Sequence, residues 1–368
     1  MKNTFGQNIS VTIYGESHGE AIGVVLDGLA PGIPVDPDFI RDQLTLRRPA
    51  GKISTARQEP DPFRILSGVY ENHTTGTPIS IMIPNTQTRS KDYTATRALA
   101  RPGHADYTAY CKYHGFEDFR GGGHFSGRIT AGLVAGGAIA ISALRAKNIL
   151  IGTHIRNCGG IMDRDFENLE SDIMNLNQKA FAVLDENKAE AIYQKMTETA
   201  EKGDSIGGIL ETAILNMPAG VGEPWFDTIE GMLSHALFSI PAIKGVQFGN
   251  AFDRVTSCPG SEYNDPFRMG ADNQIITETN HNAGINGGIT NGMPIVFQCA
   301  VKPTPSIYQT QNTVNFLEKQ NAVLQIQGRH DPAIIHRARV VVDSMTALVL
   351  CDILAGRYGT DWLAESVN

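Results

Sequence analysis

Hydrophobic and polar positions along this chain follow two periods, one typical of strands and one typical of helices. Short β-branched runs that end in turn residues predict strands at 11–14, 22–28, 63–70, 78–84, 149–160, 207–220 and 295–301. Longer runs predict helices at 36–49, 127–147, 187–204, 226–240 and 333–356. The stretches 85–120 and 279–294 are polar and are expected to be irregular. No linker or charge run divides the chain, so we expect one continuous domain that mixes helices and strands.

Composition narrows the possible ligands. The net charge of −8 disfavours nucleic acids and acidic membranes, so an anionic ligand needs a local basic pocket. The 38 glycines indicate backbone that comes close to something else or that turns sharply. Five scattered cysteines without a C-x-x-C pair favour a reducing compartment over a disulfide or zinc framework. MKNTFGQNIS lacks an apolar leader, and the apolar run 129–144 is too short to span a membrane. We therefore expect a cytoplasmic protein.

The sequence GESHG (15–19) fits the G-x-S-x-G elbow that presents the nucleophilic serine of α/β-hydrolases. A true elbow leads from a buried strand into a helix, whereas EAIGVVLDG after Gly19 is typical of a strand. A turn is the better interpretation, and a serine hydrolase that uses Ser17 is the alternative. The chain has no P-loop and no H-E-x-x-H, and GGGHFSG has the wrong spacing for a dinucleotide fingerprint. We expect no metal site.

Histidines and arginines in glycine-rich loops carry the remaining chemical signal. Histidine suits proton transfer near neutral pH, and the arginine fork binds carboxylate and phosphate in bidentate fashion. RPGHADY (101–107) and GRHDP (328–332) both place arginine and histidine beside aspartate. This recurrence indicates either that the chain has two similar halves that meet at a common site, or a chance repetition of common residues. These residues indicate an enzyme that binds an anion and transfers protons; they are His18, His104, His330, Arg47, Arg48, Arg57, Arg101, Arg120, Arg128 and Arg329.

Taken together, several motifs resemble the chorismate synthase family from about residue 5 to residue 355. They are GQNISVTIYGESHG, DGLAPGIP, RRPAG, RQEPD, TTGTPI, RPGHADY, RGGG, GDSIGG, KGVQFG, KPTPS and GRHDP. The resemblance implies an α+β fold, a single-domain β-α-β sandwich with two similar halves over residues 1–368, assembled as a homotetramer. It also implies a lyase of the shikimate pathway that converts 5-enolpyruvylshikimate-3-phosphate to chorismate. Phosphate and a ring proton leave in a 1,4-elimination that needs reduced FMN without net redox change.

The resemblance also implies roles for individual residues. His18 matches the acid toward the departing phosphate, His104 the residue that protonates reduced flavin, and Asp331 the carboxylate that assists the flavin in ring-proton removal. Arg47 matches an NADP-binding position, whereas Lys52 stands where a second arginine is expected. The expected flavin contacts are Gly287, Lys302, Pro303, Thr304, Pro305, Ser306 and Arg329. We assign Arg48, Arg101 and Arg128 to the substrate.

The loop after RGGG departs from the family pattern R-S-S-A-R-E-T. Here it is HFSGRIT, so His124, Phe125 and Ser126 occupy the expected flavin-binding positions. If His124 faces the flavin, affinity for FMN should fall as the pH rises from about 6 to 8, because histidine loses its charge there. The alternative is that His124 packs in the loop and backbone amides hold the cofactor. An anion-binding or flavin-binding module without catalysis is the non-enzymatic alternative. NADPH or an external flavin reductase could supply the reduced flavin.

Overall fold

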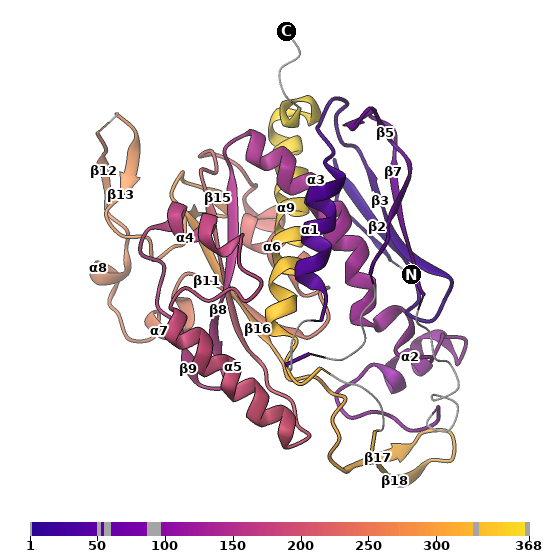
Figure 1. The fold of residues 1–368 in the computed structure, drawn as a ribbon. Coiled ribbons are helices and arrows are strands. Elements are labelled where there is room, and N and C mark those ends of the chain that lie inside the picture. Colours follow the sequence, from indigo (N-terminus) through magenta and orange to yellow (C-terminus); the bar gives the residue numbers. More distant parts are fainter. Residues whose placement is uncertain are drawn as a thin grey trace.

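Two antiparallel five-stranded sheets face each other across a layer of helices (Figure 1). The computed structural model describes residues 2–49, 53–54, 60–86, 97–271, 273–326 and 331–364. The fold is mixed α+β, as the sequence predicts. All five cysteines are free thiols.

The first sheet has the strand order β1-β2-β3-β7-β4. Its strands are β1 (Thr4–Phe5), β2 (Ser10–Gly15), β3 (Ala21–Asp27), β7 (Ile79–Pro84) and β4 (Arg64–Ser67). In β7 the buried residues alternate as Ile79, Ile81 and Ile83, so one face of the sheet turns toward the helices. The GESHG segment makes the turn between β2 and β3, whose register pairs Gly15 with Ile22.

The second sheet has the order β11-β16-β10-β8-β9. Its strands are β11 (Ile243–Phe248), β16 (Ile295–Val301), β10 (Gly208–Leu215), β8 (Leu150–Cys158) and β9 (Ile161–Met162). The long central strand β10 is almost wholly buried, because it pairs along its length with β8 on one side and with β16 on the other.

The helix layer consists mainly of α1 (Pro37–Arg47), α3 (Thr130–Ala146), α6 (Ile229–Leu237) and α9 (Ile335–Tyr358). Helices α3 and α9 pack on each other, α3 covers β3 and β7, and α9 covers β8 and β10. Two glycines of α3 allow this close packing. A methyl group at Gly132 would lie 2.8 Å from the backbone oxygen of Gly23, and one at Gly137 would lie 2.7 Å from Cα of Ser344.

Helix α3 and the residues just before it, Gly127–Ala146, are long and apolar enough to cross a membrane, and the rest of the described chain holds no second such helix. However, 83% of the apolar window is buried inside the protein. The same length and composition are typical of a core helix, which is how the structure uses this segment.

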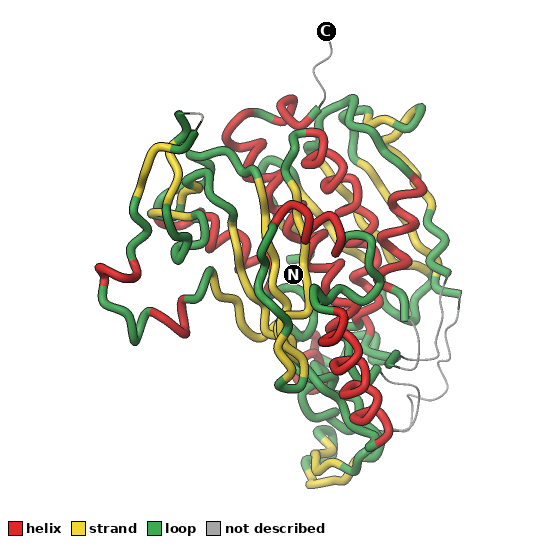
Figure 2. Tube along the Cα trace, turned by 60° about the vertical axis from the view of Figure 1, so that its left-hand side comes forward, coloured by secondary structure: helices red, strands yellow, loops and turns green. Residues whose placement is uncertain are grey.

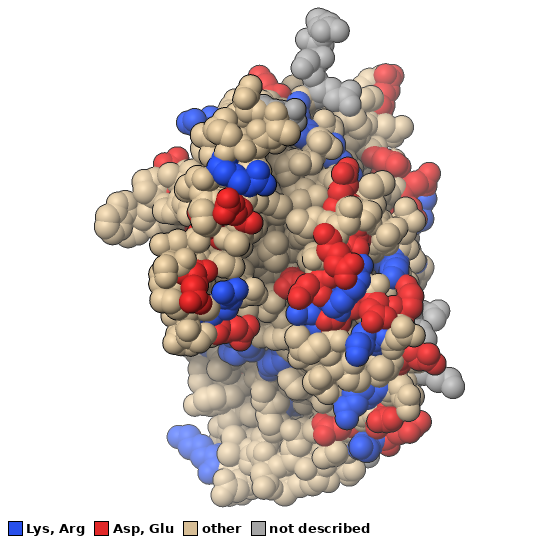
Figure 3. Space-filling view, turned by 90° about the vertical axis from the view of Figure 1, so that its left-hand side faces the viewer, with Lys and Arg blue, Asp and Glu red and all other residues tan. Residues whose placement is uncertain are grey.

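Smaller elements lie around the two sheets (Figure 2). Hairpin β12–β13 and helices α7 and α8 extend from one side of the body, and hairpin β17–β18 extends from its lower end (Figure 1). On the face shown in Figure 3, acidic and basic side chains are interspersed. The elements are β5 (Val69–Tyr70), β6 (His73–Thr74), α2 (Asp106–Tyr113), α4 (Leu169–Leu176), α5 (Glu186–Glu201), α7 (Ala251–Arg254), α8 (Gly260–Tyr263), β12 (Phe267–Met269), β13 (Ile275–Thr277), β14 (Ile285–Asn286), β15 (Ile289–Thr290), β17 (Gln311–Asn315) and β18 (Gln320–Leu324).

Asp352 ties the N-terminal segment to the last helix. Its carboxylate accepts hydrogen bonds from the backbone N–H groups of Gln7, Asn8 and Ile9, at 2.6–3.1 Å. The aspartate belongs to α9 and is 1% exposed, so the contact lies inside the protein. The first sheet is thereby attached directly to the C-terminal helix.

Each predicted helix is present, although its ends shift by a few residues. Asp36 caps α1, since its side chain accepts from the N–H of Asp38. The expectation of irregular structure was wrong in two places: α2 lies within 85–120, and the short strands β14 and β15 lie within 279–294. The strand predicted at 63–70 divides into β4 and β5 at Gly68, because the φ angle of +82° at this glycine lies outside the strand region.

Candidate functional site

The turn between β2 and β3 places Ser17 and His18 in the interior. They are 1% and 7% exposed, and Oγ of Ser17 lies 3.0 Å from Nδ1 of His18. Oγ of Ser17 also donates to the backbone oxygen of Arg120 at 3.2 Å. The motif leads from one antiparallel strand into the next rather than into a helix, so it is not a hydrolase elbow.

Three consecutive glycines, Gly121, Gly122 and Gly123, let a loop pass between the two predicted catalytic histidines. Their φ angles of +67°, +136° and +53° are in the region that favours glycine. A methyl group at Gly121 would lie 2.2 Å from Cε1 of His18, and one at Gly122 would lie 3.4 Å from Nε2 of His104. The missing side chain at Gly121 therefore leaves room for the His18 ring, whereas one at Gly122 would only touch His104.

His104 is held by its own segment, RPGHADY. Its Nδ1 lies 2.8 Å from Oδ1 of Asp106, whose two oxygens also accept 2.6 Å and 2.8 Å bonds from the guanidinium of Arg101. Burial alone would raise the pKa of Asp106, but hydrogen bonds from Arg101 and His104 outweigh burial and hold that pKa far below its usual range. The carboxylate next to His104 is therefore ionised.

Several arginines gather around one buried carboxylate, Asp61. It is 2% exposed, lies 3.0 Å from Nη2 of Arg47 and 3.8 Å from Nε of Arg48, and also pairs with Arg128. Burial lowers the pKa of Arg47 to about 10; Asp61 opposes this shift, and the nearby Arg337 and Arg128 add to it. Nε of Arg47 and Nε of Arg48 are buried and have no hydrogen-bond partner in the described part of the chain. These two donors are suited to an anion.

Arg128 is engaged by the protein itself. It donates to Asp61, to Oδ1 of Asn85 at 3.0 Å and to the backbone oxygen of Pro84 at 3.2 Å. It is 8% exposed, so its charge adds to the local positive potential while its fork links the strand end at Pro84 to the start of α3.

Asp331 lies just before α9 and forms an ion pair with Arg337 of that helix. Nε of Arg337 in turn donates to the backbone oxygen of Arg47 at 2.7 Å. The carboxylate and the arginine cluster are therefore linked by one guanidinium. Arg329, predicted to bind flavin, lies outside the described residues, as do His330, Arg57 and Lys52.

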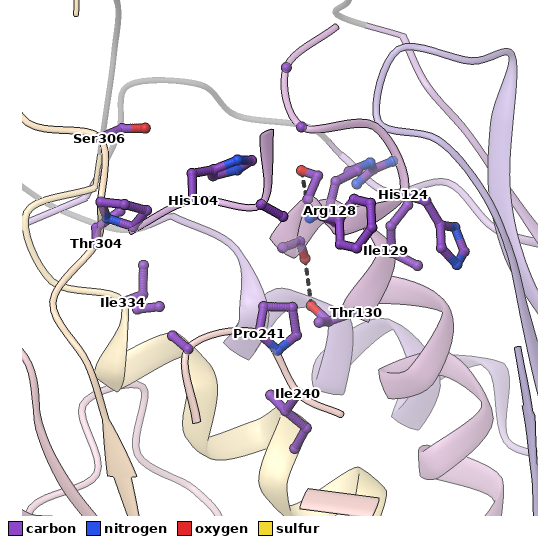
Figure 4. Close-up of a pocket in the computed structure, with 18 of the residues that line it drawn as sticks. His104, His124, Arg128, Ile129, Thr130, Ile240, Pro241, Thr304, Ser306 and Ile334 are labelled. Carbon is purple, nitrogen blue, oxygen red and sulfur yellow. Dashed lines mark hydrogen bonds between the residues drawn. The ribbon is translucent and has the colours of Figure 1, made fainter. Parts of the chain in front are cut away.

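The segment KPTPS follows β16 and lies beside the loop that carries His104. Nζ of Lys302 donates to the backbone oxygen of Gly103, the neighbour of His104. Oγ1 of Thr304 is buried and has no hydrogen-bond partner among the described residues. Figure 4 shows Thr304 and Ser306 on the same side of the cavity as His104.

His124 is bonded to the first sheet. Its Nδ1 donates to the backbone oxygen of Gly15 at 2.7 Å, and in the view of Figure 4 its ring points away from His104. The next two residues differ in exposure and contacts. Phe125 is 39% exposed and packs edge-on against Tyr113, and Ser126 accepts from the N–H of Arg128. This loop therefore begins α3 and also faces the cavity.

These residues surround a cavity of about 1800 Å³ between the sheets and the histidine loops. Its lining includes eight Lys or Arg residues and four Asp or Glu residues, a local net charge of +4 in a protein of net charge −8. An apolar floor comes mainly from α3, α9 and the segment after α6; its residues include Leu133, Ile240, Ile334, Val341 and Met345. The cavity thus joins a basic rim to an apolar base.

The structure brings most of the predicted site residues to this cavity. Those that line it are His18, Arg47, Arg48, Arg101, His104, His124, Phe125, Ser126, Arg128, Lys302, Thr304, Pro305, Ser306 and Asp331. Pro303 does not line it, and Gly287 lies in the turn between β14 and β15, away from it. The described residues hold no cluster of three or more His, Cys, Asp or Glu that could bind a metal ion.

Sequence reasoning missed several residues of the site. Asp61 ends the recognised motif RQEPD, and Asp106 belongs to RPGHADY, but neither received a role. Arg97, Arg337 and Pro241 also line the cavity. Arg337 could have been identified from its position, because it lies six residues after Asp331 and just inside a predicted helix.

Comparison with known proteins gives one consistent result. A family model described as chorismate synthase matches residues 9–355. The chain is 44% identical over 354 residues to a chorismate synthase of Dehalococcoides mccartyi, covering 96% of each chain. It is 41% identical over 352 residues to one of Thermococcus kodakarensis, covering 96% of this chain and 97% of the other. A crystal structure of chorismate synthase superposes with a TM-score of 0.76 at 28% identity and covers 96% of this chain and 94% of that one.

Proposed function

The chain belongs to the chorismate synthase family, a family of lyases, and on that premise we propose that it converts 5-enolpyruvylshikimate-3-phosphate to chorismate with the help of reduced FMN. The reaction is a 1,4-elimination of phosphate and a ring proton, the last step of the shikimate pathway. The observation that carries the proposal is the local charge of +4 around a cavity in an acidic protein, because the substrate bears one phosphate and two carboxylates.

The size and donors of the cavity fit two ligands. Its volume of about 1800 Å³ exceeds the ~300–1,000 Å³ of an ordinary single-ligand pocket. The unpartnered Oγ1 of Thr304 offers a hydrogen bond beside Lys302 and Ser306, and the apolar floor suits a flat ring system. We therefore propose that the Thr304 side holds FMN, together with the loop at Phe125 and Ser126. Arg329, Gly287 and Pro303 stay proposed cofactor contacts on family resemblance alone.

Arginines and His18 would act on the phosphate. Arg48 donates to the substrate through Nε, which forms no hydrogen bond among the described residues and lies 3.8 Å from Asp61, and Arg47 does the same from the end of α1. His18 transfers a proton to the departing phosphate oxygen through Nε2, because its Nδ1 is bonded to Ser17. Arg128 and Arg101 add positive charge at the rim, although both are engaged by carboxylates of the protein.

His104 and Asp331 would act where the ring proton leaves. Bound reduced FMN supplies electron density and a basic nitrogen for this step and is not consumed. His104 donates a proton from Nε2 when its ring is charged, because Nδ1 is bonded to Asp106, and Asp331 presents a carboxylate that Arg337 fixes in place. The apolar floor excludes water from the same region, which strengthens each of these electrostatic contacts.

Further proposals follow from the family and agree with the structure. We propose that the chain forms one domain of the family's β-α-β sandwich type with two similar halves, and that it assembles as a homotetramer. Exposed apolar side chains such as Trp225 (86% exposed) and Phe226 (94% exposed) support the assembly.

Free thiols at all five cysteines support a cytoplasmic location. NADPH at Arg47, or an external reductase, is the proposed source of reduced flavin.

An anaerobic assay with pre-reduced FMN tests the function. Purified protein is mixed with 5-enolpyruvylshikimate-3-phosphate, and phosphate release and chorismate absorbance are followed together. We expect equal amounts of both products, only in the presence of reduced FMN. Arg48→Lys should raise KM, because lysine lacks the bidentate fork, whereas Lys188→Ala on the exposed face of α5 should change nothing. Phosphate release without chorismate, or without any need for FMN, would contradict the proposal.

A further inference from the structure

Asp106 is placed to control the proton on His104. The two side chains are two residues apart at the start of α2, and their 2.8 Å contact joins Oδ1 to Nδ1. A carboxylate at this distance accepts a hydrogen bond from the ring, so the proton of neutral His104 belongs on Nδ1. Nε2 is then the nitrogen that faces Gly122 and the cavity, where a methyl group on the glycine would lie 3.4 Å away.

Arg101 fixes the carboxylate rather than the ring. Asp106 accepts from Nε and Nη2 of Arg101 at 2.8 Å and 2.6 Å, and from the backbone N–H of Arg101 at 2.9 Å. Nη2 of Arg101 also lies 3.1 Å from Nδ1 of His104, but it cannot donate to a nitrogen that already carries a proton. The clamp therefore leaves the carboxylate one orientation, in which Oδ1 faces the ring.

Few charged side chains lie next to the ring of His104. Arg101 and Asp106 come from its own segment, and they neutralise each other. Lys302 reaches the neighbouring Gly103 from the segment after β16; on the other side Gly122 faces the ring, and the charges of that loop include the ion pair of Asp118 and Arg120. Asp106 is consequently the carboxylate in direct contact with the ring among the described residues.

We propose that Asp106 is a positioning residue for the reaction: it fixes the Nδ1–H tautomer of His104, stabilises the charged ring and directs Nε2 into the cavity. The carboxylate–histidine pair has the same logic as the Asp–His pair of serine proteases, in which the aspartate orients the ring and stays ionised. The proposal rests on the proposed function, in which His104 is a proton carrier. The competing explanation is that Asp106 only pairs with Arg101 and begins α2.

Histidine NMR separates the two explanations without any cofactor. Protein labelled with ¹⁵N at histidine is titrated, and the His104 signal is identified by its absence in His104→Gln. We expect wild-type His104 to be the Nδ1–H tautomer when neutral. In Asp106→Asn we expect the Nε2–H tautomer to appear, because the amide can donate to Nδ1. An Nε2–H tautomer in the wild type overturns the proposal even if the variant does not fold.

Kinetics then connect the tautomer to the reaction. Asp106→Asn should lower kcat at least ~100-fold with little change in KM, and Asp106→Glu should recover part of the loss. Asp172→Asn is the matched control, because Asp172 also binds an arginine fork (Arg164) and a backbone N–H but contacts no histidine. An unchanged Nδ1–H tautomer of His104 in Asp106→Asn, or equal losses of kcat in Asp106→Asn and Asp172→Asn, would overturn the proposal. A wild type that forms no chorismate would contradict the proposed function and leave the NMR result standing.

Discussion

Replacing Asp61 by asparagine should destabilise the protein strongly, because one buried carboxylate offsets several arginines. Asparagine keeps the shape of the side chain but removes its charge and one acceptor oxygen. Arg47 at 3.0 Å and Arg128 would then face each other without a counterion, and both are less than one-tenth exposed. Arg48 at 3.8 Å would lose a weaker attraction.

The size of the loss follows from the geometry. Charges about 4 Å apart attract by about 4 kcal/mol at an effective dielectric constant near 20. Removing one partner of a buried pair costs about 3–5 kcal/mol in proteins, since the remaining charge stays desolvated. We expect a loss in this range for Asp61→Asn, a large part of the ~5–15 kcal/mol that stabilises a typical protein.

Urea unfolding at pH 7 measures this loss, with Asp165→Asn as the control. Asp165 also pairs with an arginine, Arg156, but it is 80% exposed, so we expect a change of only about 0–1 kcal/mol. Inorganic phosphate should restore more stability to Asp61→Asn than to the wild type, because the anion can replace the lost carboxylate among the arginines. A loss as small as that of Asp165→Asn would refute the reasoning.

The pH dependence of stability supplies a second test of the ion pairs around Asp61. Burial alone would raise the pKa of Asp61, but Arg47 and Arg128 outweigh it and lower the pKa below its usual value. A lowered folded-state pKa stabilises the fold at every pH above the unfolded value near 3.9, and this contribution disappears as the pH falls through the folded-state pKa. The difference between wild type and Asp61→Asn should therefore shrink below about pH 4. A constant difference down to acid unfolding would show that Asp61 does not titrate as an ion-paired carboxylate.

Three further predictions concern the histidine loops. His18→Ala should lower the rate of chorismate formation at least ~100-fold, whereas Ser17→Ala should keep most activity; labelling of Ser17 by a fluorophosphonate with loss of activity would reverse these roles. Gly121→Ala should displace His18, because the methyl group would lie 2.2 Å from its ring, and should cost far more activity than Gly160→Ala, which has a similar positive φ of +84° but no atom within 4 Å. FMN titrations at pH 6–8 should give parallel curves for the wild type and His124→Arg, because the His124 ring is bonded to a backbone oxygen of the first sheet; converging curves would show that the side chain senses the cofactor's charge.

The sequence predicted the elements of the fold better than their arrangement. Strand β7 is visible because its buried residues alternate, and helix α3 is visible because its apolar run is too long for an ordinary strand. The short helix α2 is not visible, since only Ala109 in it is buried and no apolar stripe marks it. The central position of β10 depends on its pairing with strands far apart in the chain, which no local pattern records.

The candidate site shows the same division between local and distant contacts. Motifs identified His18, His104 and Asp331 because each belongs to a short recognisable run. The contact between Asp61 and Arg128 joins residues 67 positions apart, so no motif contains both partners. Arg128 was assigned to the substrate, yet its guanidinium mostly binds the protein, a difference that only the folded chain makes visible.

The burial of α9 has a consequence for how the protein is made. The helix packs against α3, α6, β8 and β10 and holds Gln7, Asn8 and Ile9 through Asp352, yet ribosomes synthesise it after all of these partners. At ~5–20 residues per second, the 188 residues between the end of α3 and the start of α9 take roughly 10–40 s to translate. During that time α3 lacks its main helical neighbour, and its apolar surface stays open to other chains. Nascent protein should therefore depend on chaperones during this interval, and a premature stop before residue 335 should yield insoluble product rather than a smaller folded unit.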